Sequence, residues 1–220
     1  KPFIGVGAKY IWYFAIGLHI ILIVYFTIKF LLKLQMPKVF ASYFIVYVGI
    51  AVAAVTAPAF EELAIGAGAF WFGFLTLIGL LVLVTIRYMK YKEIPEPAKP
   101  LFCIYAAPTS LCVAGYVQSV TPKSREFLLA MLLVATVLYV LALVKAISYL
   151  KLKFYPSYAA FTFPFVISAI ATKHTMVCLA NMKQPIPMLR YVVLIETVIA
   201  VLFMIYTFIR FLQFIFVDHK

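Results

Sequence analysis

Apolar stretches long enough to cross a membrane follow one another along almost the whole chain. A helix needs about 20 mainly apolar residues to cross a hydrocarbon core of about 30 Å. Hydropathy predicts seven such helices, over residues 10–32, 38–60, 64–88, 99–120, 126–149, 155–180 and 190–216. Of the 220 residues, 66% are hydrophobic and only 12% are charged, which excludes a soluble domain. The sequence therefore predicts an all-α integral membrane protein in which residues 1–220 form one transmembrane domain.

Basic residues are more numerous on one side of the predicted bundle than on the other. The formal net charge of +12 would indicate nucleic-acid binding in a soluble protein, but between membrane helices it indicates orientation, and we expect no nucleic-acid partner. One side holds Lys29, Lys33, Lys38, Arg87, Lys90, Lys92, Lys99, Lys145, Lys151, Lys153, Arg210 and Lys220. The opposite side holds Lys1, Lys9, Lys123, Arg125, Lys173, Lys183 and Arg190, together with the acidic pair Glu61 and Glu62.

This asymmetry predicts the topology of the protein. Because cytoplasmic connections carry the excess of Lys and Arg, we expect a cytoplasmic C-terminus in a multi-pass protein of the plasma membrane. Seven crossings then put the first residue of this sequence outside. We expect an odd number of further helices to precede it.

Groups for metal or cofactor chemistry are scarce. The cysteines lie inside apolar stretches, at Cys103, Cys112 and Cys178, without the spacing of zinc ligands. No pair among the three histidines has metal-ligand spacing, and no glycine-rich phosphate loop occurs. We therefore expect neither a metal nor a cofactor, and we interpret His19, in the first helix, as a structural residue.

Three of the predicted helices, the second, fourth and sixth, are rich in Gly, Ala, Ser and Thr, and each contains a proline: Pro58, Pro108 and Pro164. Small residues let helix backbones approach closely, so these helices belong inside the bundle, whereas the bulkier first, fifth and seventh suit contact with lipid. A proline frees a carbonyl that needs another partner, a situation tolerated beside neighbouring helices or a water-filled cavity. The pattern predicts three kinked inner helices around a shared path. Packing without any path remains an alternative explanation of the same pattern.

Short motifs in these helices resemble one known family. The fourth helix contains Ala107-Pro108, then Cys112-Val113 and Tyr116, and the sixth contains Ala160-Phe161-Thr162-Phe163. Further counterparts are Gly66-Ala67-Gly68 in the third helix and Trp12 and Gly17 in the first. In order and spacing, these motifs are similar to those of the tellurite-resistance/C4-dicarboxylate transporter family. That family also includes the plant slow-anion channels and the yeast malate and sulfite carriers.

The resemblance implies more than the visible helices contain. Members of the family have ten helices, arranged as five hairpins around a pseudo-fivefold axis with a central pore, and they assemble as homotrimers. The present chain matches from the fourth helix of the family onward, so three helices would precede it. The inner, pore-lining helices of the family correspond here to the second, fourth and sixth. A phenylalanine plugs the pore of the family, and the matching position is Phe163, directly before Pro164.

Two ionisable residues lie within the last two predicted helices. Lys173 comes shortly before the end of the sixth helix and Glu196 shortly after the start of the seventh, so the hairpin brings them to a similar depth. Buried charges without partners are costly, and intramembrane ionisable residues are functional candidates. The two side chains are close enough in depth to pair. The alternative is that Lys173 extends outward and Glu196 forms an interhelical hydrogen bond. In a functional role, Lys173 would with His174 attract anions at an outer mouth.

Three classes of function are compatible with a seven-helix membrane chain. The favoured hypothesis is a channel or transporter for small anions, such as malate and other C4-dicarboxylates, inorganic anions, tellurite or sulfite, because acidic residues are scarce in the inner helices. The alternative is a seven-helix membrane receptor or sensor, although a retinal protein would need a lysine deep in the last helix. A membrane-embedded enzyme would need clustered His, Asp or Glu at membrane depth, where only Glu196 is present.

Overall fold

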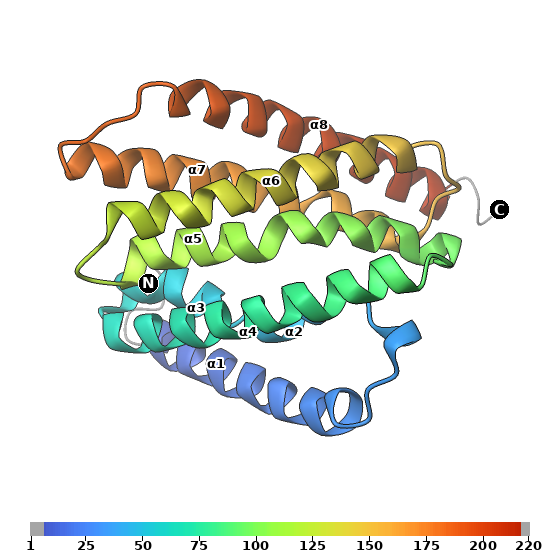
Figure 1. Ribbon diagram of the computed structural model, residues 1–220, viewed down its shortest axis with the longest axis horizontal. Helices are drawn as coiled ribbons and strands as arrows, with labels where there is room; N and C mark the ends of the chain where they lie inside the picture. The colour runs from blue at the N-terminus through green and yellow to red at the C-terminus, as the bar shows by residue number, and fades with distance from the viewer. Residues whose placement is uncertain (1–6, 217–220) are drawn as a thin grey trace.

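The computed structural model describes residues 7–216, which contain seven segments long and apolar enough to cross a membrane. These segments pack side by side (Figure 1). They are Gly7–Leu31, Tyr43–Phe60, Leu63–Lys90, Glu96–Ser119, Arg125–Tyr149, Pro156–Asn181 and Leu189–Phe216. We call them spans one to seven. The predicted all-α membrane class and the seven predicted helices are confirmed, with bounds shifted by a few residues. Lys1, Lys220 and His219 lie outside the described residues.

The spans are of two kinds. Spans three, five and seven are single α-helices: α4 (Leu63–Lys90), α6 (Arg125–Tyr149) and α8 (Leu189–Phe216). Span one is α1 (Gly7–Phe26) with a final π-helical turn, η1 (Thr27–Leu31). Spans two, four and six are each assembled from shorter helices. In chain order these are α2 (Tyr43–Val48), α3 (Ala51–Thr56) and η3 (Ala57–Phe60); η4 (Glu96–Ala106) and α5 (Ala107–Ser119); and η5 (Pro156–Phe161) and α7 (Phe163–Asn181).

Burial separates inner from outer spans as predicted. In the most apolar part of each span, the share of buried residues is 83% for span four, 56% for span six and 50% for span two, against 33% or less for the other four. Helix α5 occupies the centre and packs against α3, α4, α6 and α7, while α8 packs on α7 (Figure 1). The composite helices are therefore the interior of the bundle.

Small residues allow the central helices to approach closely. A Cβ added at Gly115 of α5 would meet Ala54 Cβ at 3.0 Å. At Gly66, near the start of α4, an added Cβ would lie 2.3 Å from Ser119 Oγ and 2.6 Å from Ala57 Cβ. At Gly66 these contacts leave no room for a side chain, whereas at Gly115 a methyl group would require its neighbours to move by a few tenths of an ångström.

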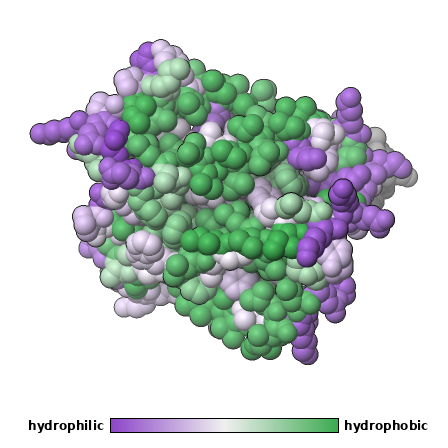
Figure 2. Space-filling model, in the orientation of Figure 1, coloured by the Kyte–Doolittle hydropathy of each residue, from purple (hydrophilic) through white to green (hydrophobic). Residues whose placement is uncertain are grey.

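The surface fits a bilayer. Figure 2 shows hydrophobic residues over the middle of the molecule and hydrophilic residues gathered at the two ends of the helices. One basic residue of the described part is buried: Arg87, at the end of α4, has 1% of its surface exposed. Its guanidinium donates hydrogen bonds to the carbonyls of Pro37 and Tyr91, both at 3.2 Å, and stacks 4.5 Å from the Phe40 ring. These contacts fasten the connection between spans one and two to α4.

Candidate functional site

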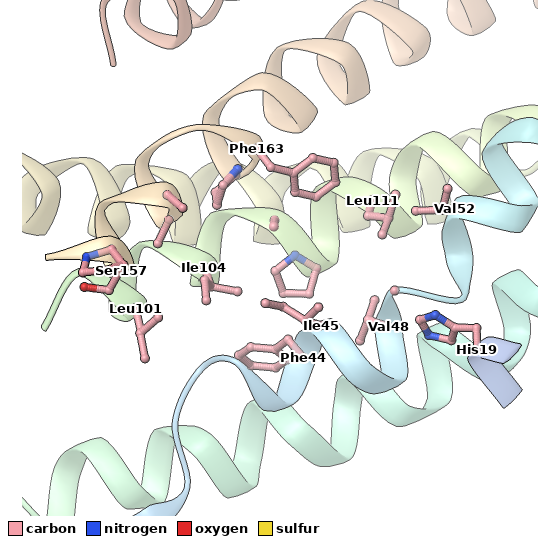
Figure 3. Close-up of a pocket in the computed structure, with 17 residues that line it drawn as sticks. His19, Phe44, Ile45, Val48, Val52, Leu101, Ile104, Leu111, Ser157 and Phe163 are labelled. Atoms are coloured by element: carbon pink, nitrogen blue, oxygen red, sulfur yellow. The ribbon is translucent and has the colours of Figure 1, made fainter. Parts of the chain in front are cut away.

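A cavity of about 700 Å³ lies between the three inner spans. Span two contributes Phe44, Ile45, Val48 and Val52, span four contributes Leu101, Ile104, Pro108 and Leu111, and span six contributes Ala160, Phe163 and Pro164 (Figure 3). The lining is apolar apart from His19 and Ser157, and no acidic side chain of the described residues reaches it. The inner spans therefore surround a shared space with neutral walls.

Two of the three prolines line this cavity and occupy equivalent positions. Pro108 is the second residue of α5, and Pro164 is the second residue of α7. In each span, a 3₁₀ helix precedes the proline and an α-helix continues from it. Proline fits the first turn of an α-helix because its missing N–H has no intrahelical acceptor there. The expected kinks in spans four and six thus take the form of a change of helix type beside the cavity.

The third proline is placed differently from the prediction. Pro58 is exposed, lies in the 3₁₀ turn η3 at the end of span two, and does not line the cavity. The helix of this span is interrupted earlier, at Gly49 and Ile50, between α2 and α3. Pro58 has no N–H to donate to Ala54, four residues earlier, and the Ser119 hydroxyl of α5 donates to the Ala54 carbonyl instead. Pro58 therefore ends the helix and helps fasten it to α5.

His19 has the structural role that was expected of it. Its Nε2 lies 2.9 Å from the carbonyl oxygen of Val46, in the last turn of α2. The interruption at Gly49 leaves the last carbonyls of α2 without helical donors. The histidine of span one satisfies one of them, and its ring also forms part of the cavity wall.

Two buried serines join α5 and α7 just behind the cavity. The hydroxyl oxygens of Ser110 and Ser168 lie 3.0 Å apart, and Ser110 donates to the carbonyl of Ala106 at 2.8 Å. Ser168 Oγ lies 2.9 Å from the Pro164 carbonyl and 3.2 Å from that of Ala106. The cluster fixes the starts of the two proline-bearing helices against each other. The sequence signal for this serine cluster was a serine two residues after Pro108 and another four residues after Pro164.

Phe163 differs sharply from the phenylalanines beside it. Phe161 and Phe165 are completely buried, whereas 49% of the Phe163 surface is exposed. Figure 3 shows its ring on the wall of the cavity opposite Phe44 and Ile45. Its backbone is held at the junction of η5 and α7. The ring is therefore not packed on all sides by the described residues.

Lys173 and Glu196 are turned away from each other. Lys173 is exposed and lines a hollow with Lys123 and His174, whereas Glu196 is 4% exposed and faces Thr172 within the bundle. Both residues are described, and they make no ion pair. The two residues do not pair because Thr172, which faces Glu196, and Lys173 are neighbours on one helix, where successive side chains point about 100° apart.

Comparison with known proteins supplies the family. A family model described as a voltage-dependent anion channel matches residues 3–212. The chain belongs to the voltage-dependent anion channel family. Searches of curated proteins and of solved structures found no match.

Membership of this channel family confirms the resemblance seen in the motifs around Pro108 and Phe163. The chain is thus a multi-pass membrane protein of a family of anion channels, and the receptor hypothesis is disfavoured. Sequence reasoning missed the helix break at Gly49 and the contribution of Lys123, which lies in a connection rather than in an inner helix. A glycine in the middle of an apolar helix was the available signal for the break.

Proposed function

We propose that the cavity between the inner spans is part of a path for small anions across the bilayer, and that Phe163 is its gate. The observation that carries the proposal is the half-exposed ring of Phe163 on the wall of an apolar space about 700 Å³ in volume, between two completely buried phenylalanines. An aromatic ring across a narrow apolar passage excludes water and so blocks hydrated ions. Rotation of the ring opens the passage.

Selectivity for anions follows from charge at the ends of the path rather than from a charged site within it. Lys123 and Lys173 lie beyond the apolar section, and no acidic side chain of the described residues lines the cavity. A low-dielectric passage between positively charged ends concentrates anions and repels cations. Small anions of this kind include C4-dicarboxylates such as malate, inorganic anions, tellurite and sulfite.

The exposed side of the cavity supports a larger assembly of helices. Ile45 and Val52 of span two are 56% and 46% exposed although they line the cavity. We propose that further inner helices cover this side, as in the ten-helix, pseudo-fivefold arrangement that the resemblance implies, with one pore in each protomer of a homotrimer. The excess of Lys and Arg at one end supports a cytoplasmic C-terminus in the plasma membrane.

The test is to record anion current through the full-length protein in planar bilayers, comparing the wild type with Phe163→Ala. Removing the ring widens and wets the passage, so we expect the conductance to rise by about tenfold or more, equivalent to lowering the barrier by about 1.4 kcal/mol.

Phe208→Ala is the matched control. Phe208 is 64% exposed on the outer helix α8 and lies away from the cavity. The conductance of the Phe208→Ala variant should therefore equal that of the wild type. Equal currents through the Phe163→Ala variant and the wild type would remove Phe163 from the mechanism.

A further inference from the structure

A second hollow, of about 520 Å³, lies between the C-terminal halves of α5 and α7. Its polar lining consists of Gln118, Lys123, Lys173, His174 and Asn181, and we call it the basic hollow. No acidic side chain of residues 7–216 lines it. It therefore combines two ammonium groups with three neutral side chains that carry N–H donors.

The polar groups of the basic hollow have no partners within the described part of the protein. None of its five polar side chains makes a hydrogen bond or an ion pair there, and the Nδ1 atom of His174 is buried without a partner. This atom has no accessible surface, so the groups that the hollow offers to an outside ligand are the two ammonium groups, the two amides and the other ring nitrogen of His174. Ammonium and N–H groups are hydrogen-bond donors, and together they bind best to an acceptor that carries negative charge.

Helix capping does not account for these side chains. Helix α7 ends in backbone turns in which the N–H of Lys183 donates to the Ala180 carbonyl at 3.0 Å and that of Gln184 to Leu179 at 2.9 Å. Lys183 has a positive φ of 57°, as the residue after a helix often does in this motif. The last carbonyls of α7 are thus satisfied by the backbone, and the side chain of Asn181, the last residue of the helix, is not needed to cap it.

The basic hollow lies on the same helix faces as the gate cavity. On α5, Gln118 follows the cavity residue Leu111 by seven residues, which is two helical turns. On α7, His174 follows Phe163 by eleven residues, about three turns, or about 16 Å along the axis. Between them, Ile170 is 37% exposed on the same face. The apolar cavity and the basic hollow therefore follow each other along one side of α5 and α7.

We infer that the basic hollow binds an oxyanion, carboxylate or tetrahedral, held by Lys123 and Lys173 with N–H donors from His174, Gln118 and Asn181. Several acceptor oxygens match several separate donors, whereas a halide offers no directed set of acceptors. The inference that the basic hollow binds an oxyanion depends only on the residues that line it. The inference that this oxyanion lies next to the gate on the anion path depends on the proposed function.

The experiment measures equilibrium binding of radiolabelled sulfate to the full-length protein, purified in an uncharged, phosphate-free detergent at low ionic strength. Removing both ammonium groups in Lys123→Gln/Lys173→Gln should weaken sulfate binding by about 100-fold, about tenfold for each charge-assisted contact. Lys183→Gln is the matched control. This variant removes one lysine charge near the C-terminal end of α7 but outside the basic hollow. Its affinity for sulfate should stay within about twofold of that of the wild type.

Three results would overturn the inference: no sulfate binding by the wild type, equal affinities for the double variant and the Lys183→Gln control, or displacement of sulfate by an equimolar concentration of chloride. Displacement by short-chain phosphatidylglycerol at concentrations below the sulfate dissociation constant would assign the site to a lipid headgroup and would also overturn it. Circular dichroism establishes that the double variant is folded.

Bilayer currents from the same preparations separate this inference from the proposed function. A wild type that binds sulfate and carries no anion current retains the site and refutes the path. A wild type that carries anion current without binding sulfate refutes the site and retains the path.

Discussion

Replacing Gly66 with alanine tests how the inner and outer helices fit together. The new Cβ would lie 2.3 Å from Ser119 Oγ and 2.6 Å from Ala57 Cβ, where ordinary contacts begin at 3.4 Å, so atoms must move by roughly 1 Å. Such overpacking costs about 1–3 kcal/mol. Displacing Ser119 also leaves the Ala54 carbonyl unpaired, because Pro58 has no N–H to offer it, at a cost of about 1–3 kcal/mol. The higher helix propensity of alanine offsets about 1 kcal/mol.

The expected net effect of Gly66→Ala is therefore a loss of about 1–5 kcal/mol in the free energy of unfolding. The assay is thermal unfolding of the detergent-solubilised full-length protein, followed by tryptophan fluorescence. Gly68→Ala is the matched control two residues away, because nothing lies within 4 Å of a Cβ added there. It should be neutral or slightly stabilising.

A double-mutant cycle identifies the cause. In a Ser119→Ala background, the hydroxyl contact and the hydrogen bond are already absent, so Gly66→Ala should cost less than in the wild type. Equal stability of Gly66→Ala and Gly68→Ala would refute the close approach of α4 and α5. An unchanged cost in the Ser119→Ala background would assign the effect to the Cβ atoms of Ala57 and of residue 119, which lie 2.6 and 2.8 Å from the added Cβ.

Two further predictions concern charges near the membrane surfaces. Arg87→Met removes a buried guanidinium and its two hydrogen bonds to carbonyls, and it should lower the free energy of unfolding by about 1–3 kcal/mol. The control, Lys90→Met, changes an exposed residue and should alter thermal stability little. Equal thermal stabilities of the two variants would contradict the role of Arg87 in holding the connection between spans one and two against α4. The Lys9 ammonium, 2.5 Å away, and then the Tyr13 hydroxyl, hold the pKa of Glu62 below its usual range. The stabilisation from this contact is therefore fully present above the usual carboxyl pKa of about 4.3 and is lost as the pH falls through the lowered pKa of the folded state. Glu62→Gln should reduce the loss of thermal stability between about pH 5 and about pH 3, and an unchanged pH profile would contradict the contribution of this pair.

The order and nature of the spans could be predicted from the sequence. In a bilayer each backbone polar group needs a partner within the protein, so an apolar stretch of sufficient length has to become a helix. The small residues of spans two, four and six predicted their inner position because close packing is the main source of helix association in lipid. Pro108 and Pro164 line the cavity between the inner spans, and their role at an anion path stays a prediction.

The contacts between particular side chains could not be predicted. Pro58 looked equivalent to the other two prolines, yet span two is interrupted at Gly49, where His19 of another span supplies the partner for a freed carbonyl. Lys173 and Glu196 have similar depths in the hairpin, yet they face different surroundings. The depth of a residue in the membrane follows from its position along the helix. The direction in which its side chain points depends on how the helix is rotated about its axis relative to its neighbours.

The sequence by itself determined which segments enter the membrane and which of them lie inside the bundle, because hydrophobicity and side-chain size act segment by segment. Only the tertiary structure decided that Phe163 is exposed while Phe161 and Phe165 are buried, and that Lys123 joins Lys173 and His174 around one hollow. Such outcomes depend on helix rotation, in which one residue along the chain turns a side chain by about 100°. Average composition does not encode that angle.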